Sequence, residues 1–179
     1  KTNRTLGFLR RNLGKCPESV KNQAYNTLIR PRLEYCSSVW DPHTKKHVKD
    51  IEGIQRRAAR FVKSCYVRVP GTVTNLLNEL KWPSLQQRRL ISRLTMMFKI
   101  VNDQNCPIQI PDYVQKKTRI TRSFHPKRFI NLGSKSNTYK YSFFIRTVKE
   151  WNGLPDELIE QETLKSFKSA LADYLNLNH

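Results

Sequence analysis

Hydrophobic and basic positions separate most clearly over residues 45–65. At about 100° per residue, this pattern predicts a helix with one buried and one exposed face. The positions expected to be buried are Val48, Ile51, Ile54, Ala58, Phe61, Val62 and Cys65. The five cations within about 60° of one another on the opposite face, which we call the basic rail, are Lys45, Lys49, Arg56, Arg60 and Lys63. Because like charges at this spacing oppose a solvated helix, the rail predicts an anionic partner.

Two further helices are expected before the rail helix. Their buried positions repeat at helical spacing and are Leu6, Leu9, Leu13, Val20, Ala24 and Leu28. Gly14 is expected to end the first helix, and Pro31 to kink or interrupt the second. Asp41 and Pro42 are expected to cap and begin the rail helix. With short connections, residues 1–66 would form a three-helix bundle.

Residues 67–106 predict connecting helices, the second of which has the most regular pattern in the chain. Ser84 and Gln87 have the spacing of a capping box at its start. Its buried stripe is expected to contain Leu85, Ile91, Leu94, Phe98 and Val101. Met96 and Met97 are expected to fill the core rather than to bind a partner.

Residues 107–179 form the third predicted segment. Between 107 and 138 the pattern dissolves into Pro, Thr, Ser, Asn and Gly, where at most a short β-hairpin is expected, around residues 134–137. Helical spacing returns over residues 142–176, where Phe144, Val148 and Trp151 mark a buried face and Thr163 can cap a last helix. The expected fold class is therefore mainly α, with a small bundle, further helices and an irregular basic segment.

The charge of the chain is far from ordinary. It carries 33 Lys and Arg against 14 Asp and Glu among 179 residues, which gives a net charge of +19 and a pI near 10.1. Residues 1–66 carry +10 and residues 111–149 carry +9, whereas residues 150–179 carry −4. Counterion release favours RNA or DNA as the partner of such a chain, with an anionic membrane surface as the weaker alternative.

Motifs of catalysis or metal binding are not evident in the sequence. It contains neither a glycine-rich phosphate-binding motif nor G-x-S-x-G nor H-E-x-x-H. His43 and His47 could share a metal ion, but a third ligand is not evident, and solvent-facing imidazoles are the alternative. The cysteines, whose spacing suits neither a zinc site nor a disulfide framework, are Cys16, Cys36, Cys65 and Cys106. Reduced thiols in an intracellular protein are expected.

The sequence shows neither an apolar run long enough to span a membrane nor a signal peptide. Its first residue, Lys1, suggests a piece of a longer protein. The three tryptophans, each expected to anchor the core, are Trp40, Trp82 and Trp151.

Two basic regions are candidate nucleic-acid contacts. The rail is expected to bind the phosphates of a duplex, and its removal is expected to affect folding little. In residues 116–129 the cations are expected to bind phosphates while Phe124, His125 or Phe129 stacks on an unpaired base. The alternatives are a solvated helix face and a flexible basic loop. The candidate binding residues are Arg10, Arg11, Lys49, Arg56, Arg60, Lys63, Arg119, Arg122, Phe124, Lys127, Arg128 and Phe129.

Five segments, taken in order, carry a family resemblance. They are RTLGFLRRNL at 4–13, YNTLIRPRLEYCSSVWDP at 25–42, IEGIQRRAARFV at 51–62, WPSLQQRRLISRLTMMFKIVN at 82–102 and YKYSFFIRTVKEWNGLP at 139–155. Together they closely resemble the C-terminal part of reverse transcriptases encoded by jockey-like non-LTR (LINE-type) retrotransposons. The resemblance covers nearly the whole chain. It implies that Lys1 to about Cys65 is the polymerase thumb and that the rest is the following C-terminal domain.

The resemblance also implies what this chain lacks. In that family the catalytic aspartates lie upstream, in an aromatic-x-Asp-Asp signature of the palm, and this sequence has no Asp-Asp. The chain alone is therefore expected to be no enzyme and to need no cofactor. The parent protein would be an RNA-directed DNA polymerase whose Mg²⁺ binds in the absent palm. Some relatives carry a Cys/His zinc knuckle near the C-terminus, and this sequence has none, so the basic segment would have to grip RNA instead.

The expected function is to grip template RNA and the RNA/DNA duplex during target-primed reverse transcription. The expected partners are RNA, RNA/DNA or DNA duplex and the upstream palm and fingers of the same polyprotein, with no membrane. The resemblance implies a nuclear and cytoplasmic location. Two rival hypotheses stay open: a helical protein–protein assembly module whose charge is incidental, and a domesticated remnant with a new cellular partner.

Overall fold

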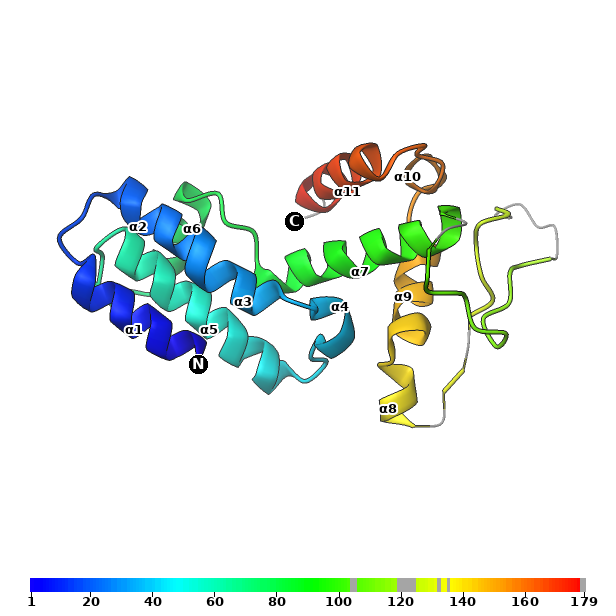
Figure 1. Ribbon diagram of the computed structural model, residues 1–179, viewed down its shortest axis with the longest axis horizontal. Coiled ribbons are helices and arrows are strands. Elements are labelled where there is room, and N and C mark those ends of the chain that lie inside the picture. The colour runs from blue at the N-terminus through cyan, green and yellow to red at the C-terminus, as the bar shows by residue number, and fades with distance from the viewer. Residues whose placement is uncertain (104–105, 119–124, 132, 135, 178–179) are drawn as a thin grey trace. The chain divides into compact units, whose positions relative to one another are not determined.

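The chain is mainly helical in the computed structural model, with 64% of it in helices (Figure 1). The residues that the structure describes are 1–103, 106–118, 125–131, 133–134 and 136–177. They contain essentially no strand, which confirms the mainly α fold class. Within these ranges no helix is both long and apolar enough to cross a membrane. The chain divides into two compact units, residues 1–89 and 90–179, with the boundary inside α7 (Leu85–Asn102).

The first unit is built around α5, which packs against α1, α2 and α6 (Figure 1). Its elements are α1 (Thr2–Asn12), α2 (Glu18–Ala24), the π-helical turn η1 (Tyr25–Ile29), α3 (Arg30–Glu34), α4 (Ser37–Trp40), α5 (Lys45–Val62), α6 (Thr72–Glu79) and the start of α7. Residues 67–89 belong to this unit because Trp82 stacks on Tyr25, with ring centroids 3.9 Å apart, and Leu85 enters the same core. The compact unit thus extends beyond the predicted segment 1–66, whose identity as a thumb stays a prediction.

The second helical stretch buries a different stripe from the one expected. Val20 and Leu28 are exposed, and the buried positions are Lys21, Tyr25, Ile29 and Leu33. Tyr25, Ile29 and Leu33 remove more apolar area from water than the predicted set, so they decide which face turns inward. Lys21 tolerates burial because its Nζ lies over the Phe61 ring, 5.7 Å from the centroid, and donates to Ser64 Oγ at 2.6 Å.

The π-helical turn η1 precedes Pro31, which was expected to disturb this helix. Proline has no backbone N–H and its ring clashes with the carbonyl four residues earlier. A π turn is one of the ways in which a helix accommodates such a disturbance. The chain then leaves α3 through Cys36, whose φ of 50° is left-handed, and forms the short helix α4.

The connection between α4 and α5 corrects two predictions. Asp41 does not cap the rail helix: α5 begins after Thr44, and Asp41 Oδ1 accepts a hydrogen bond from Arg89 Nε at 2.7 Å instead. Trp40 is not a core anchor, because it is 40% exposed and its Nε1 donates to the Tyr35 carbonyl. The other two tryptophans do pack in cores, Trp82 partly buried and Trp151 completely.

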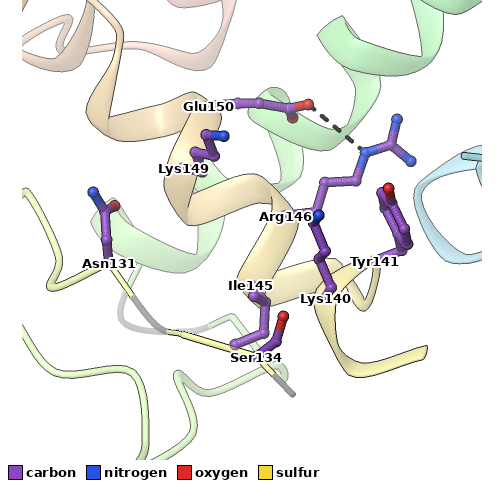
Figure 2. A pocket seen from close by; sticks show the side chains of 8 residues that line it. All are labelled: Asn131, Ser134, Lys140, Tyr141, Ile145, Arg146, Lys149 and Glu150. Carbon is purple, nitrogen blue, oxygen red and sulfur yellow. Dashed lines mark ion pairs between the residues drawn. The ribbon is translucent and has the colours of Figure 1, made fainter. Parts of the chain in front are cut away.

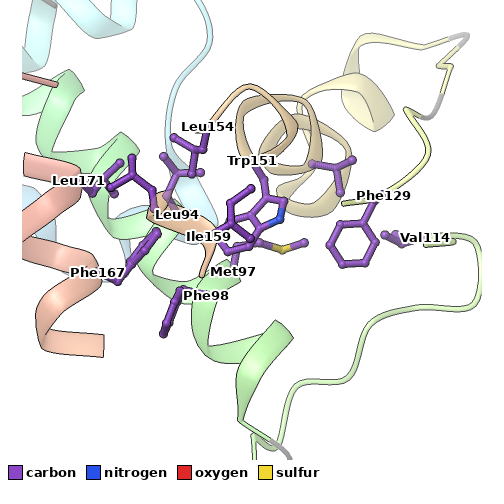
Figure 3. Close-up of a cluster of buried hydrophobic side chains, with 12 residues drawn as sticks. Leu94, Met97, Phe98, Val114, Phe129, Trp151, Leu154, Ile159, Phe167 and Leu171 are labelled. Carbon is purple, nitrogen blue, oxygen red and sulfur yellow. The ribbon is translucent and has the colours of Figure 1, made fainter. Parts of the chain in front are cut away.

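The second unit packs the rest of α7 against three helices and an irregular segment. These helices are α9 (Phe143–Asn152), α10 (Asp156–Ile159) and α11 (Leu164–Leu177), and the short helix α8 (Asn137–Lys140) precedes α9 and buries no residue. Its core gathers around Trp151, with Phe167 and Phe98 stacked at 4.4 Å and Met97 completely buried (Figure 3). The predicted caps are present, since the Ser84 and Thr163 hydroxyls accept from the Gln87 and Ser166 amides.

The expected hairpin near residues 134–137 is wrong. Ser136 instead caps α8, which begins at Asn137. In the described part of the irregular segment, the one bridge joins Lys116 and Phe129 in antiparallel fashion. Tyr139 lies in α8, Tyr141 follows its last residue, and Phe143 begins α9, whose buried face includes Val148 and Trp151.

Candidate nucleic-acid interface

The rail on α5 divides into exposed and occupied cations. Lys45, Lys49 and Arg56 are exposed, and Arg60 is half-buried. Lys63 lies at the C-terminal end of α5, where its Nζ binds Glu18 at 2.9 Å and Glu79 at 3.1 Å. The hydrogen bonds that Lys63 donates to Glu18 and Glu79 raise the pKa of Lys63 above its usual value.

Lys63 therefore differs from the prediction made for the whole rail. It joins the start of α2 to the end of α6, because Glu18 opens α2 and Glu79 closes α6. Removing it would leave two carboxylates without their cation, so we expect an effect on folding. Phosphate contact is better assigned to the exposed members of the rail.

The buried face of α5 is also wider than the apolar pattern indicated. Gln55 and Ala59 are buried together with Ala58, Phe61 and Val62. The Gln55 amide reaches the core because its Nε2 donates to the Pro83 carbonyl at 3.0 Å. An interhelical polar contact of this kind cannot be recognised from hydrophobic periodicity.

Almost all carboxylates of the first unit bind groups other than the exposed rail cations Lys45, Lys49 and Arg56. The unit holds 19 Lys and Arg against six Asp and Glu, which are Glu18, Glu34, Asp41, Asp50, Glu52 and Glu79. Glu18 and Glu79 bind Lys63; Glu34 and Asp41 bind arginines of α7. With Glu52 also occupied, only Asp50 makes no ion pair or hydrogen bond within residues 1–89, all of which are described. The positive charge of Lys45, Lys49 and Arg56 is therefore left uncompensated.

Glu52 lies on the rail helix but does not pair with the rail cations. Its sequence position, three residues after Lys49 and four before Arg56, would suit ion pairs with either. Instead its Oε1 accepts a hydrogen bond from the Gln86 backbone amide at 2.8 Å, in the first turn of α7. Carboxylates are stabilised at helix N-termini by the unpaired amides and the helix dipole.

Helix α1 adds exposed cations to the same unit. Arg10 and Arg11 are both exposed, and the guanidinium of Arg10 lies over the ring of Tyr66, 5.3 Å from its centroid. Arg57 of α5 donates to Asn3 of α1 at 2.9 Å, which links the two helices on this side. The predicted contacts from α1 and α5 thus belong to one compact unit.

The second predicted binding region is used largely for packing where the structure describes it. Phe129 is 0% exposed inside the core around Trp151, so the stacking role expected for it is corrected: its ring presents no face to a base (Figure 3). Arg128 donates to the Leu154 carbonyl and to Asp156 Oδ1 at 2.7 Å. Lys127 is half-buried beside Ile159. Arg119, Arg122 and Phe124 lie outside the described residues.

The packing of this region has a clear structural origin. Asn152 of α9 donates to the Phe129 carbonyl and accepts from its amide, at 2.7 and 3.0 Å. The indole of Trp151 donates to the Lys127 carbonyl at 2.9 Å. His125 is buried, and its Nε2 lies 3.4 Å from Glu160. Residues 125–131 are therefore held against the C-terminal helices rather than forming a loose basic loop.

Comparison with protein-family models, curated proteins and solved structures finds no match to this chain. Its function must therefore be argued from the surface itself. His43 and His47 are exposed at the start of α5. In the part of the chain that the structure describes, no three His, Cys, Asp or Glu side chains are grouped so as to hold a metal ion.

A cavity in the second unit was not predicted from the sequence. It has a volume of about 850 Å³ and lies along α8 and α9 (Figure 2). The residues that line it are Asn131, Ser134, Lys140, Tyr141, Ile145, Arg146, Lys149 and Glu150. The sequence carries no signal for it, because its lining joins α8 and α9 to Asn131 and Ser134 and so depends on how these segments pack.

Proposed function

We propose that residues 1–89 grip the sugar–phosphate backbone of a nucleic-acid duplex, as the thumb of an RNA-directed DNA polymerase does. The observation that carries this proposal is the charge distribution of the first unit. Two of its six carboxylates bind Lys63 at the end of the rail and three contact α7, while Lys45, Lys49 and Arg56 project from one face of α5 without an acidic partner among residues 1–89.

The chemistry of this face suits the backbone rather than the bases. Lysine and arginine on a helix contact phosphates, which fixes the register of the duplex without reading its sequence. From Lys45 to Arg60 the rail spans about 22 Å along α5, at 1.5 Å per residue. A rail of this length can meet several phosphates of one duplex, as processive copying of any template requires.

The wider context of this function is also part of the proposal. The parent protein would be a retrotransposon reverse transcriptase that acts by target-primed reverse transcription in nucleus and cytoplasm. Its palm, with the Mg²⁺-binding aspartates, would precede this chain and form its protein partner. Residues 90–179, which follow the duplex-binding unit in the chain, would make a second contact with template RNA.

Duplex binding at several salt concentrations tests the proposal. Fluorescence anisotropy measures the affinity for an RNA/DNA hybrid between about 50 and 200 mM salt. The slope of the logarithm of the binding constant against the logarithm of the salt concentration should become shallower by about 0.9 for each phosphate that a variant no longer binds. For Lys49→Ala and Arg56→Ala we therefore expect an affinity loss of about eightfold each near 100 mM salt. The double variant should lose about 60-fold, on several unrelated sequences alike.

Lys81→Ala is the matched control because Lys81 is an exposed cation of the same unit beside Trp82 and Gln55. It should bind duplex like the unaltered chain. Lys63→Ala should lower the free energy of unfolding of the unit, with little change in the salt dependence of duplex binding. If Lys49→Ala and Arg56→Ala bind hybrid as tightly as Lys81→Ala, with the same salt dependence, the duplex grip is wrong.

A second candidate function, a helical protein–protein assembly module, is favoured by one observation. Tyr35, which follows α3, is 77% exposed, and in α4 Val39 is 84% and Trp40 40% exposed. Exposed aromatic and aliphatic groups this close together are typical of protein interfaces. In that case duplex affinity would be nearly flat between about 50 and 200 mM salt, the opposite of the result expected for the duplex grip.

A further inference from the structure

The cavity along α8 and α9 is lined by cations together with Tyr141 and Ile145. Ile145 is 7% exposed, and Tyr141 is half-buried. The cations of the lining are Lys140, Arg146 and Lys149 (Figure 2). A volume of about 850 Å³ lies in the range of sites that bind small ligands or single monomer units of a polymer.

The single carboxylate of the cavity does not neutralise this charge. Both oxygens of Glu150 accept from Arg93 Nη2, at 2.7 and 2.5 Å. Glu150 also lies 3.7 Å from Arg146 Nε, the pair drawn in Figure 2. Arg93 is buried in the same unit, and its burial lowers its pKa while Glu150 counteracts this effect. The carboxylate is thus shared between two guanidinium groups.

Two lysines at the cavity have no acidic partner among the residues that the structure describes, so their charge can attract an anionic ligand. Neither Lys140 nor Lys149 makes an ion pair with any residue that the structure describes, and both are exposed. Lys140 Nζ lies 5.6 Å from the centroid of the Tyr141 ring, which places a cation next to the aromatic surface. The two lysines are cations that can bind phosphates, and Tyr141 supplies the one aromatic ring among the lining residues.

We propose that this cavity binds a nucleotide unit of single-stranded nucleic acid, with Lys140 and Lys149 on the phosphates and the base against Tyr141. Single-stranded nucleic acid is bound in general by cations along the backbone and aromatic rings under the bases. A duplex keeps its bases stacked inside, so it cannot place one in the cavity. The inference rests on the proposed function and makes it more specific, because it places the contact of the second unit with template RNA in this cavity.

The test compares single-stranded RNA with an RNA/DNA hybrid of the same sequence, using anisotropy on the full chain. Lys149→Gln should weaken single-strand binding about fivefold near 100 mM salt and lower its salt slope by about 0.7. Tyr141→Ala should weaken it by about 5- to 150-fold, the range for one stacked base. Both variants should bind the hybrid unchanged, whereas Lys49→Ala and Arg56→Ala act on the hybrid, so the two proposals fail separately.

Lys168→Gln is the matched control, because Lys168 is an exposed cation of α11 that does not line the cavity. If Tyr141→Ala does not fold, Lys149→Gln still tests the proposal, because Lys149 is exposed and its replacement should not affect folding. The proposal is overturned if Lys149→Gln binds single strands like Lys168→Gln, or if it weakens hybrid and single strand equally. Uridine monophosphate should compete with single-stranded RNA more strongly than inorganic phosphate does at equal concentration. Equal competition would show that the base does not contribute to binding in the cavity.

Discussion

Asp41 and Arg89 form an ion pair in the interior of the first unit. Arg89 is 0% exposed and the Asp41 side chain 5%, and their atoms Oδ1 and Nε are 2.7 Å apart. The pair ties the connection between α4 and α5 to the first turns of α7, 48 positions later. It therefore holds the start of the rail helix against the rest of the unit.

Asp41→Asn should destabilise the first unit by about 3–5 kcal/mol, the range for breaking a buried pair. Asparagine keeps the shape and one acceptor oxygen, so the loss is that of the negative charge which compensates the buried guanidinium. Domains of this size are stable by about 5–15 kcal/mol, so the variant should lie near the limit of folding. Replacing both partners, in Asp41→Leu with Arg89→Met, should recover most of the loss because no buried charge is left.

Native-state hydrogen exchange resolves the two units and is the appropriate assay. Amides in residues 1–89 should lose protection in Asp41→Asn while those in residues 90–179 keep theirs. Asp50→Asn is the control, because Asp50 is exposed and makes no ion pair within residues 1–89; it should cost about 0.5 kcal/mol or less. An Asp41→Asn loss below about 1 kcal/mol would refute the reasoning, because the guanidinium would then be compensated by other groups.

Two further predictions follow from buried rings. Tyr25 is buried with a hydroxyl that makes no hydrogen bond in the described structure, and burial raises its pKa well above its usual value. Tyr25→Phe should be neutral or stabilising by about 1 kcal/mol near pH 7, and it should remove a stability loss of about 1.4 kcal/mol per pH unit above pH 10. The sign follows because the unfolded chain releases this proton first; urea unfolding at pH 8 and 11 measures it, and identical alkaline losses in both proteins would contradict it. Phe129→Ala should cost about 3–5 kcal/mol in the second unit with unchanged single-strand affinity per folded molecule, whereas a stable variant with weakened binding would restore the stacking role.

The sequence alone determined the features that depend on local periodicity. The rail helix, the stripe of Leu85, Leu94 and Phe98 on α7, and the caps at Ser84 and Thr163 were all predicted, because the residues that specify a helix lie within a few turns of one another. The same locality explains the first error in the fold. Where two apolar stripes compete on one helix, as Val20 with Tyr25, periodicity does not say which one meets the rest of the core.

Only the tertiary structure decided which charges and rings stay available to a ligand. Lys63 and Arg56 are equivalent members of one helical face in the sequence, yet Glu18 and Glu79 occupy the first and no acid of residues 1–89 binds the second. Phe129 lies in a polar, basic segment, yet Asn152 holds its backbone so that its ring fills the core. Ion pairs and burial join residues that are tens of positions apart, and their partners are set by the packing of whole helices.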